Sequence, residues 1–171
     1  MQRTASPGSD GEQEFLQRYG HVYEHSPWIA RSVHARTGGA ADSWEALDAV
    51  FREVIETAGA DQQLALLRAH PELACRERDA LTQASLQEQS GAGLDRCSPA
   101  ELDEFAALNR AYRARFGFPF IIAVAGLERA EILREFRARL GHDAESEQRE
   151  ALRQVLRIGR LRLRQAWHEQ P

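Results

Sequence analysis

The sequence has 171 residues, of which 43% are hydrophobic and 28% are charged, and its formal net charge is −4. This length suits one domain with a substantial core, and the weak acidic balance gives no reason to expect nucleic acid or an anionic membrane as partner. All 22 basic residues are arginine, which excludes catalysis through a lysine Schiff base and the lysine anchor of pyridoxal phosphate enzymes.

The first residues, 1–11, are polar and include no apolar stretch like that of a secretory signal, so we expect a disordered tail followed by a helical domain over residues 12–171. No apolar run approaches the roughly 18 residues of a membrane span. The last residues do not spell the Ser-Lys-Leu peroxisomal signal. Together these features predict a cytoplasmic protein without a membrane partner.

Four helices are predicted in the first half of the chain. Apolar residues recur at helical spacing from Phe15 to Tyr23, and Ser43 starts another helix whose apolar stripe runs to Ile55. Proline and glycine mark the ends, because proline disfavours the α region for the preceding residue and glycine favours helix termini. The four helices should therefore end at Ser26–Pro27, Gly38–Gly39, Gly59 and His70–Pro71.

In the second half, S-L-Q-E at 85–88 has the spelling of a capping box, and glycines at 91 and 93 close that short helix. Ser98–Glu101 is a second capping box, opening a helix that ends at Gly117. The apolar run FGFPFIIAVAG at 116–126 lacks helical period and contains Phe118–Pro119, so we interpret it as a buried, extended passage. Two amphipathic helices, 128–140 and 146–167, complete a single all-α domain of about eight helices, a helical bundle.

The stretch HVYEHSPW matches the H-x-x-E-H pattern of an inverted zinc-peptidase motif. On a helix, His21 and His25 would share one face, with Glu24 as base, and zinc would need a third protein ligand. No second motif supplies that ligand. We therefore favour a helix junction here and keep a zinc hydrolase as the less favoured alternative.

Three other stretches carry groups suited to chemistry. RAHPELA places His70 at a helix C-terminus, where the macrodipole favours the imidazolium form expected of a proton donor. SLQEQSGAGL places Ser85, Glu88 and Gln89 at i, i+3 and i+4, so that all three could face one pocket. FGFPFIIAVAG leaves backbone polar groups that need partners. A turn histidine, a capping box and a buried connection are the ordinary explanations of the same three stretches.

These stretches occur in a characteristic order: EHSPW, AHPELA, SLQEQSGAGL, NRAYRARFGFPFII and finally IGRLRL. In this order they resemble the 2-oxo-4-hydroxy-4-carboxy-5-ureidoimidazoline (OHCU) decarboxylases of urate degradation. The resemblance extends from about Phe15 to Leu163, nearly the whole chain. It identifies HVYEHSPW as the family's helix junction and makes His21 incidental.

The resemblance implies an all-helical, homodimeric enzyme that uses no cofactor or metal and converts OHCU to (S)-allantoin. It places the catalytic histidine at His70 and the catalytic glutamate at Glu88. The late arginine of the family falls best on Arg162, with Arg160 as the alternative. The implied substrate-binding positions are Pro71, Ser85, Gln89, Phe120, Ile121, Ile122, Ala123, Val124 and Arg162.

Two cysteines, Cys75 and Cys97, are too few for a metal cluster or a disulfide framework, and we expect both to be free thiols. Cys75 is a departure, because the family commonly has glycine at that position. The alternative from a different functional class is a catalytically inactive helical module that binds a partner through apolar grooves.

Overall fold

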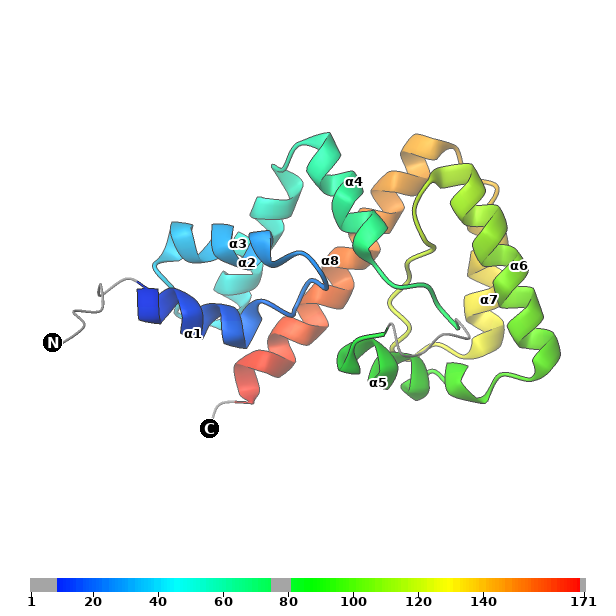
Figure 1. The fold of residues 1–171 in the computed structure, drawn as a ribbon, viewed down its shortest axis with the longest axis horizontal. Helices are drawn as coiled ribbons and strands as arrows, with labels where there is room; N and C mark the ends of the chain where they lie inside the picture. The colour runs from blue at the N-terminus through cyan, green and yellow to red at the C-terminus, as the bar shows by residue number, and fades with distance from the viewer. Residues whose placement is uncertain (1–8, 75–80, 170–171) are drawn as a thin grey trace, which may run out of the picture. The chain divides into compact units, whose positions relative to one another are not determined.

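A computed structural model of the chain describes residues 9–74 and 81–169. This part contains eight α-helices, one 3-10 helix and no strand, which confirms the all-α prediction (Figure 1). None of the described helices is both long and apolar enough to cross a membrane. The helices are α1 (Ser9–Tyr19), α2 (Pro27–Thr37), α3 (Trp44–Glu56), α4 (Ala60–Ala69), α5 (Gln83–Gly91), η2 (Leu94–Arg96), α6 (Pro99–Phe116), α7 (Arg129–Arg139) and α8 (Ala144–His168).

The chain divides into two compact units. The first unit comprises the residues up to Leu66 together with those from Gly159 onward, and the second comprises Leu67–Ile158. Helices α4 and α8 have residues in both units. Helix α1 begins at Ser9, inside the stretch expected to be a tail, and the rest of that expectation lies outside the described residues.

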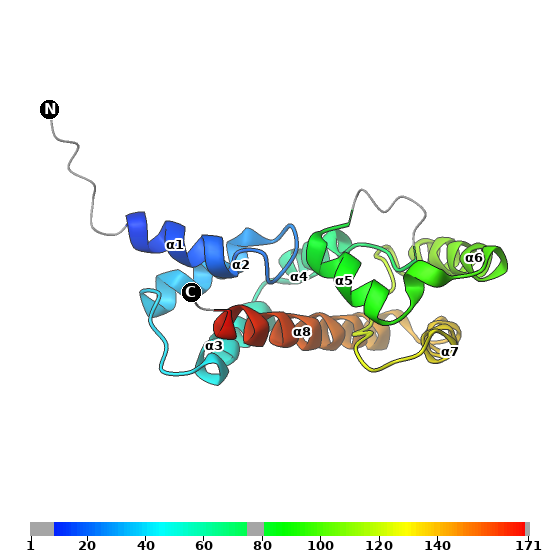
Figure 2. The same cartoon turned by 90° about the horizontal axis from the view of Figure 1, so that it is seen from below.

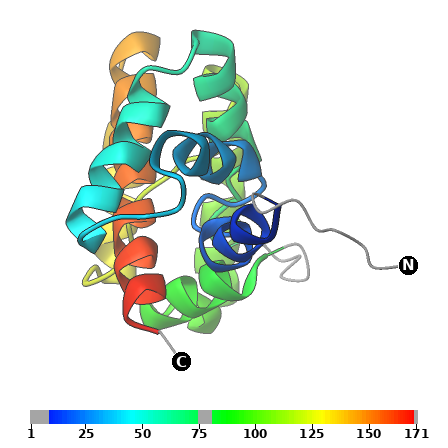
Figure 3. The ribbon, with the colours of Figure 1, turned by 90° about the vertical axis from the view of Figure 1, so that its left-hand side faces the viewer.

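In the first unit, α2 packs against both α1 and α3, as Figure 3 shows. Helix α3 buries an apolar stripe at helical spacing, and Ser43 caps it by accepting a hydrogen bond from the Ala46 N–H at 3.1 Å. The predicted extension of the first helix to Ser26 is wrong, because α1 ends at Tyr19 and turns follow up to Ser26. Val22 and Tyr23 are still buried, so their apolar character reflects the core and not a helix.

In the second unit, α6 and α7 lie next to each other (Figures 1 and 2). The capping box at Ser98–Glu101 is confirmed: Ser98 N–H donates to Glu101 Oε2 at 2.8 Å, and Glu101 N–H donates to Ser98 Oγ at 3.2 Å. The capping box predicted at Ser85 is wrong. Helix α5 starts earlier, and the side chain of Thr82 caps it by accepting from Ser85 N–H at 3.3 Å.

Aromatic rings fill the core of the second unit. The Phe120 and Phe136 rings are stacked with centroids 3.9 Å apart, and Tyr112 meets Phe120 edge-on at 5.4 Å. Phe105 and Phe118 complete the cluster. Phe118 and Phe120 belong to the passage expected from FGFPFIIAVAG, and the structure confirms it as non-helical and buried from Phe118 to Val124. The expectation is wrong at its ends, because Phe116 is the last residue of α6 and residues 125–126 form an exposed turn. This passage is therefore held in the core by its own rings.

Helix α8 contains a glycine, Gly159, where packing leaves no room for a side chain. A Cβ atom built at Gly159 would lie 2.3 Å from the Tyr23 hydroxyl oxygen and from its ring carbon Cζ. Tyr23 is itself buried, so it cannot swing aside into solvent. The glycine of IGRLRL therefore lets α8 approach the turn that follows α1 within the first unit.

We expect Gly159→Ala to lower the melting temperature by about 2–8 °C, because overpacking costs about 1–3 kcal/mol and exceeds the gain of up to about 1 kcal/mol in helix propensity. Thermal unfolding followed by circular dichroism measures the shift. Gly11→Ala is the matched control, since Gly11 is also helical and nothing lies within 4 Å of the added Cβ. A Gly159→Ala protein as stable as the control would contradict the packing argument.

Candidate active site

His70 follows the last residue of α4 and begins a turn. Its backbone N–H donates to the Leu67 carbonyl at 3.3 Å, and its Nδ1 lies 3.2 Å from the Pro71 carbonyl oxygen. Both His70 and Pro71 are half-buried. Proline at the next position prevents a further helical turn, so the imidazole is carried on a helix end that the sequence itself terminates.

The residues after Pro71 are fastened to α5 by one side chain. Gln89 Oε1 accepts from the Ala74 N–H at 3.0 Å, and Gln89 Nε2 donates to the Glu72 carbonyl at 3.3 Å. Asn109 of α6 donates from Nδ2 to the Leu73 carbonyl between them, at 3.0 Å. Two buried amide side chains thus hold the backbone of residues 72–74. The segment 70–74, called the histidine turn below, is tied to α5 by Gln89.

Ala74 adopts a left-handed backbone conformation with φ +49°. This region costs a non-glycine residue about 1–2 kcal/mol, so the surrounding contacts must hold it there. The hydrogen bond from its N–H to Gln89 is one such contact. Gln89, which the resemblance assigns to substrate binding, therefore has both ends of its amide engaged with the turn.

Ser85 and Glu88 lie inside α5 with Gln89. The spacing places all three on one side of the helix, and Ser85 is buried whereas Glu88 is half-buried. The ordinary explanation of this pair, a capping box, does not apply because Thr82 is the cap. Capping therefore does not explain why Ser85, in the first turn of α5, is buried.

The passage Phe120–Val124 is buried at every position. Two side chains from later helices bind its backbone: Arg139 donates from Nη1 to the Ile121 carbonyl at 2.8 Å, and the Ala123 N–H donates to Gln154 Oε1 at 3.0 Å. His70, Pro71, α5 and this passage all belong to the second unit. Neither Arg139 nor Gln154 was found from the sequence, because each lies in an ordinary helical pattern.

The two late arginines differ in their surroundings, and both belong to the first unit. Arg162 is buried, and its Nη1 lies 3.1 Å from Glu24 Oε1 and donates to the Val22 carbonyl at 3.4 Å. Arg160 is exposed over the Trp44 ring, with its Nε 3.9 Å from Asp48 Oδ2. Burial raises the pKa of the Asp48 carboxyl, and Arg160 acts in the opposite direction.

The helical premise of the zinc interpretation is wrong. His21 and His25 lie in turns after α1, and His25 has φ +57°, so the two imidazoles do not share a helix face. Glu24, expected as the zinc base, is the ion-pair partner of Arg162. In residues 9–74 and 81–169, no group of three histidine, cysteine, aspartate or glutamate side chains is placed to hold a metal ion.

Of the two cysteines, only Cys97 lies in the described part of the chain, where it is a half-buried free thiol as expected. Burial raises the pKa of this thiol, and the carboxylate of Glu101 adds to the effect. A raised pKa keeps the thiol protonated at neutral pH and argues against a nucleophilic role. The predictions for Cys75 lie outside the described residues.

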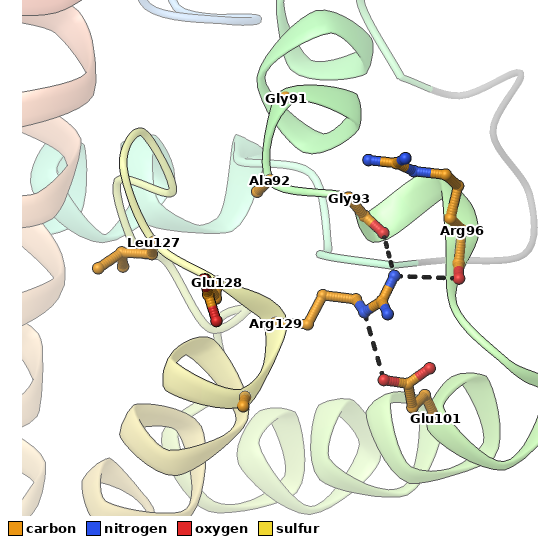
Figure 4. A pocket seen from close by; sticks show the side chains of 9 residues that line it. Gly91, Ala92, Gly93, Arg96, Glu101, Leu127, Glu128 and Arg129 are labelled. Carbon is orange, nitrogen blue, oxygen red and sulfur yellow. Dashed lines mark hydrogen bonds and ion pairs between the residues drawn. The ribbon is translucent and has the colours of Figure 1, made fainter.

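A polar pocket of about 590 Å³ lies beside the end of α5 (Figure 4). The Arg129 guanidinium bridges its walls, with Nη1 donating to the carbonyls of Gly93 at 2.9 Å and Arg96 at 3.0 Å, and Nε 3.3 Å from Glu101 Oε1. No residue that the sequence assigned to the substrate site lines this pocket. The contacts of Arg129 join the start of α7 to the α5–α6 connection.

An all-helical chain whose histidine turn is tied to a helix bearing serine, glutamate and glutamine has the groups of an enzyme that works by proton transfer. The family described as OHCU decarboxylase matches residues 9–164, and the chain belongs to this family.

The similarity extends to individual proteins. The chain is 40% identical over 152 residues to the 2-oxo-4-hydroxy-4-carboxy-5-ureidoimidazoline decarboxylase of Haloferax volcanii, covering 89% of this chain and 88% of that protein. A crystal structure of (S)-allantoin synthase matches with a TM-score of 0.72 and 29% identity, over 94% of this chain and 54% of that one. A crystal structure of OHCU decarboxylase in the presence of (S)-allantoin matches with a TM-score of 0.72 over 91% of this chain and 98% of that one, and its 22% identity supports the fold alone.

Gln89→Met tests whether the hydrogen bonds from Gln89 to Glu72 and Ala74 stabilise the histidine turn. The change keeps the volume but leaves a buried Ala74 N–H without its acceptor, which costs about 1–3 kcal/mol. We expect the melting temperature to fall by about 2–8 °C. Gln87→Met, an exposed position of the same helix, should leave it unchanged; equal shifts in the two variants would show that the two hydrogen bonds contribute nothing.

Proposed function

We propose that this protein decarboxylates OHCU to (S)-allantoin without a cofactor. The observation that carries the proposal is the tie between the His70 turn and α5, because it brings an imidazole-bearing turn to the helix that carries Ser85 and Glu88. Membership of the OHCU decarboxylase family supports the same reaction. The domain over residues 12–171 remains our assignment of the catalytic part.

The chemistry needs few groups. The substrate carboxylate is attached to a carbon next to a ring C=N, so the imine nitrogen accepts the electron pair released when the carbon–carbon bond to CO2 breaks, and it takes up a proton from solvent. Glu88 hydrogen-bonds the 4-hydroxyl or removes its proton as this oxygen becomes the carbonyl of the product. His70 then delivers one proton to one face of the intermediate and sets its configuration.

The substrate would also need a binding surface. We propose that Pro71, Ser85 and Gln89, with the buried passage 120–124, bind the ring and the ureido group. For the substrate carboxylate we keep the assignment that the resemblance implies, Arg162, since a guanidinium can bind a carboxylate through two parallel N–H donors. The homodimer that the resemblance implies, and a cytoplasmic location, stay predictions.

Generating the substrate in place tests the reaction. Urate treated with urate oxidase and hydroxyisourate hydrolase supplies OHCU, and circular dichroism follows (S)-allantoin after this protein is added. We expect (S)-allantoin to appear faster than spontaneous decay produces the racemate, with or without EDTA. No acceleration would favour the inactive binding module, and activity lost to EDTA and restored by zinc would favour a metal enzyme.

His70→Asn should remove the proton donor while keeping a polar side chain of similar size. We expect the rate to fall by about 100- to 10,000-fold, as is typical for the loss of a general acid, and the residual product to be racemic. Far-UV circular dichroism checks that the fold survives. His21→Asn is the matched control at an exposed position; a folded His70→Asn enzyme still producing (S)-allantoin at the wild-type rate would show that the proton has another source.

Arg162→Lys and Arg160→Lys separate the two late arginines. Lysine keeps the charge opposite Glu24 but loses the two-pronged geometry that matches a carboxylate. We expect Arg162→Lys to raise KM by about 10-fold or more, since charge-assisted hydrogen bonds contribute about 1.5–3 kcal/mol, and Arg160→Lys to leave it unchanged. The reverse pattern in steady-state kinetics would move the carboxylate contact to Arg160.

A further inference from the structure

The passage Phe120–Val124 is neither helix nor strand, yet it must present its backbone to a ligand if the proposed function holds. Two side chains bind its backbone, one at a carbonyl group and one at an N–H group. Arg139 donates to the Ile121 carbonyl at 2.8 Å, and Gln154 accepts from the Ala123 N–H at 3.0 Å. One anchor comes from α7 and the other from α8. A carbonyl and an N–H held two residues apart fix both the position and the direction of the passage.

Arg139 is itself held rigidly in the core. It is 3% exposed, and its Nε lies 2.9 Å from Oε1 of Glu147, which is 0% exposed. The Tyr112 hydroxyl donates to the same carboxylate, and His142 Nδ1 lies 2.8 Å from Oε2. The guanidinium carbon also lies 4.5 Å from the centroid of the Phe120 ring. Arg139 thus touches two consecutive residues of the passage and cannot adopt another orientation.

A contribution to overall stability does not explain why the Arg139–Glu147 ion pair is buried here. Replacing a buried ion pair with apolar side chains of similar volume is often neutral or stabilising, whereas the pair does fix one geometry. What apolar side chains cannot do is hydrogen-bond the Ile121 carbonyl.

Gln154 is oriented by a second contact. Its Nε2 donates to Glu150 Oε1 at 2.7 Å, one turn earlier on α8, so its Oε1 is the end that faces Ala123. The amide therefore cannot flip without losing both bonds. The two anchors come from different helices, and one is a cation whereas the other is a neutral amide.

We infer that Arg139 and Gln154 are positioning residues that hold the backbone of Phe120–Val124 in the geometry that binds the substrate. This inference rests on the proposed function, since it concerns the same site. Neither side chain needs to touch the substrate. Their loss should therefore weaken binding more than it slows the chemical step.

Steady-state kinetics of two conservative variants tests the inference. Gln154→Met removes the acceptor at similar volume, and Arg139→Lys keeps the charge opposite Glu147 but cannot also reach the Ile121 carbonyl with a planar fork. We expect KM to rise about 3- to 10-fold for Gln154→Met and about 10-fold or more for Arg139→Lys, with kcat changed by less than KM. The inhibition constant of the product (S)-allantoin should rise in parallel.

Matched controls separate positioning from general stability. Gln148→Met makes the same exchange at another half-buried position of α8, and Arg137→Lys does so at an exposed position of α7. A purely structural role would lower the melting temperature and the active fraction while leaving KM unchanged. If Arg139→Lys does not fold, Gln154→Met decides alone.

The outcomes are distinct. Wild-type protein that does not accelerate (S)-allantoin formation would refute the proposed function and this inference with it. Active wild-type protein, with folded variants whose KM and product inhibition equal those of the controls, would refute the inference alone.

Discussion

The buried pair of Arg139 and Glu147 is the interaction that fixes the geometry around the passage 120–124. Removing a guanidinium and a carboxylate from water is costly, and their attraction offsets this cost only when the remaining donors and acceptors are satisfied. Here Tyr112 and the Ile121 carbonyl provide that satisfaction. Burial and, to a smaller extent, hydrogen bonding to Glu147 raise the pKa of the Tyr112 hydroxyl, so it stays a donor. The ion pair and its hydrogen bonds therefore connect α6, α7, α8 and the passage 120–124.

Much of the fold could be predicted from local rules, and the errors have physical causes. Ser43 and Ser98 cap helices as expected, since a cap depends on a few adjacent residues. Val22 and Tyr23 extended the helical period of α1 without being helical, because turn residues buried in the same core are apolar for the same reason. The pattern S-L-Q-E was misassigned because α5 begins at Gln83, before Ser85, and Thr82 caps it by accepting from Ser85 N–H.

The residues of the candidate site are named from the sequence, and their roles stay predictions. The order of the motifs pointed to His70, Ser85, Glu88 and the passage 120–124, and family membership supports the interpretation. The residues that hold this site in shape could not be found in the same way. Asn109 acts on Leu73 and Gln154 acts on Ala123, at separations of 36 and 31 residues. Such contacts exist only after helices pack, and nothing in the local pattern of α6 or α8 distinguishes these amides from solvent-facing ones.

The contacts of Arg139 and Arg129 are ones that lysine, which this chain lacks, could not make. Arg139 binds a carboxylate, a backbone carbonyl and an aromatic face, and Arg129 bridges two carbonyls and a carboxylate. A compact ammonium cannot satisfy partners spread around a plane, whereas a guanidinium offers five donors in fixed directions. In the first unit, Arg162 joins Glu24 to the Val22 carbonyl in the turn after α1. Arginine therefore binds non-helical segments to helices in both units, which fixes their backbone in a part of the chain, residues 9–74 and 81–169, that has no strand.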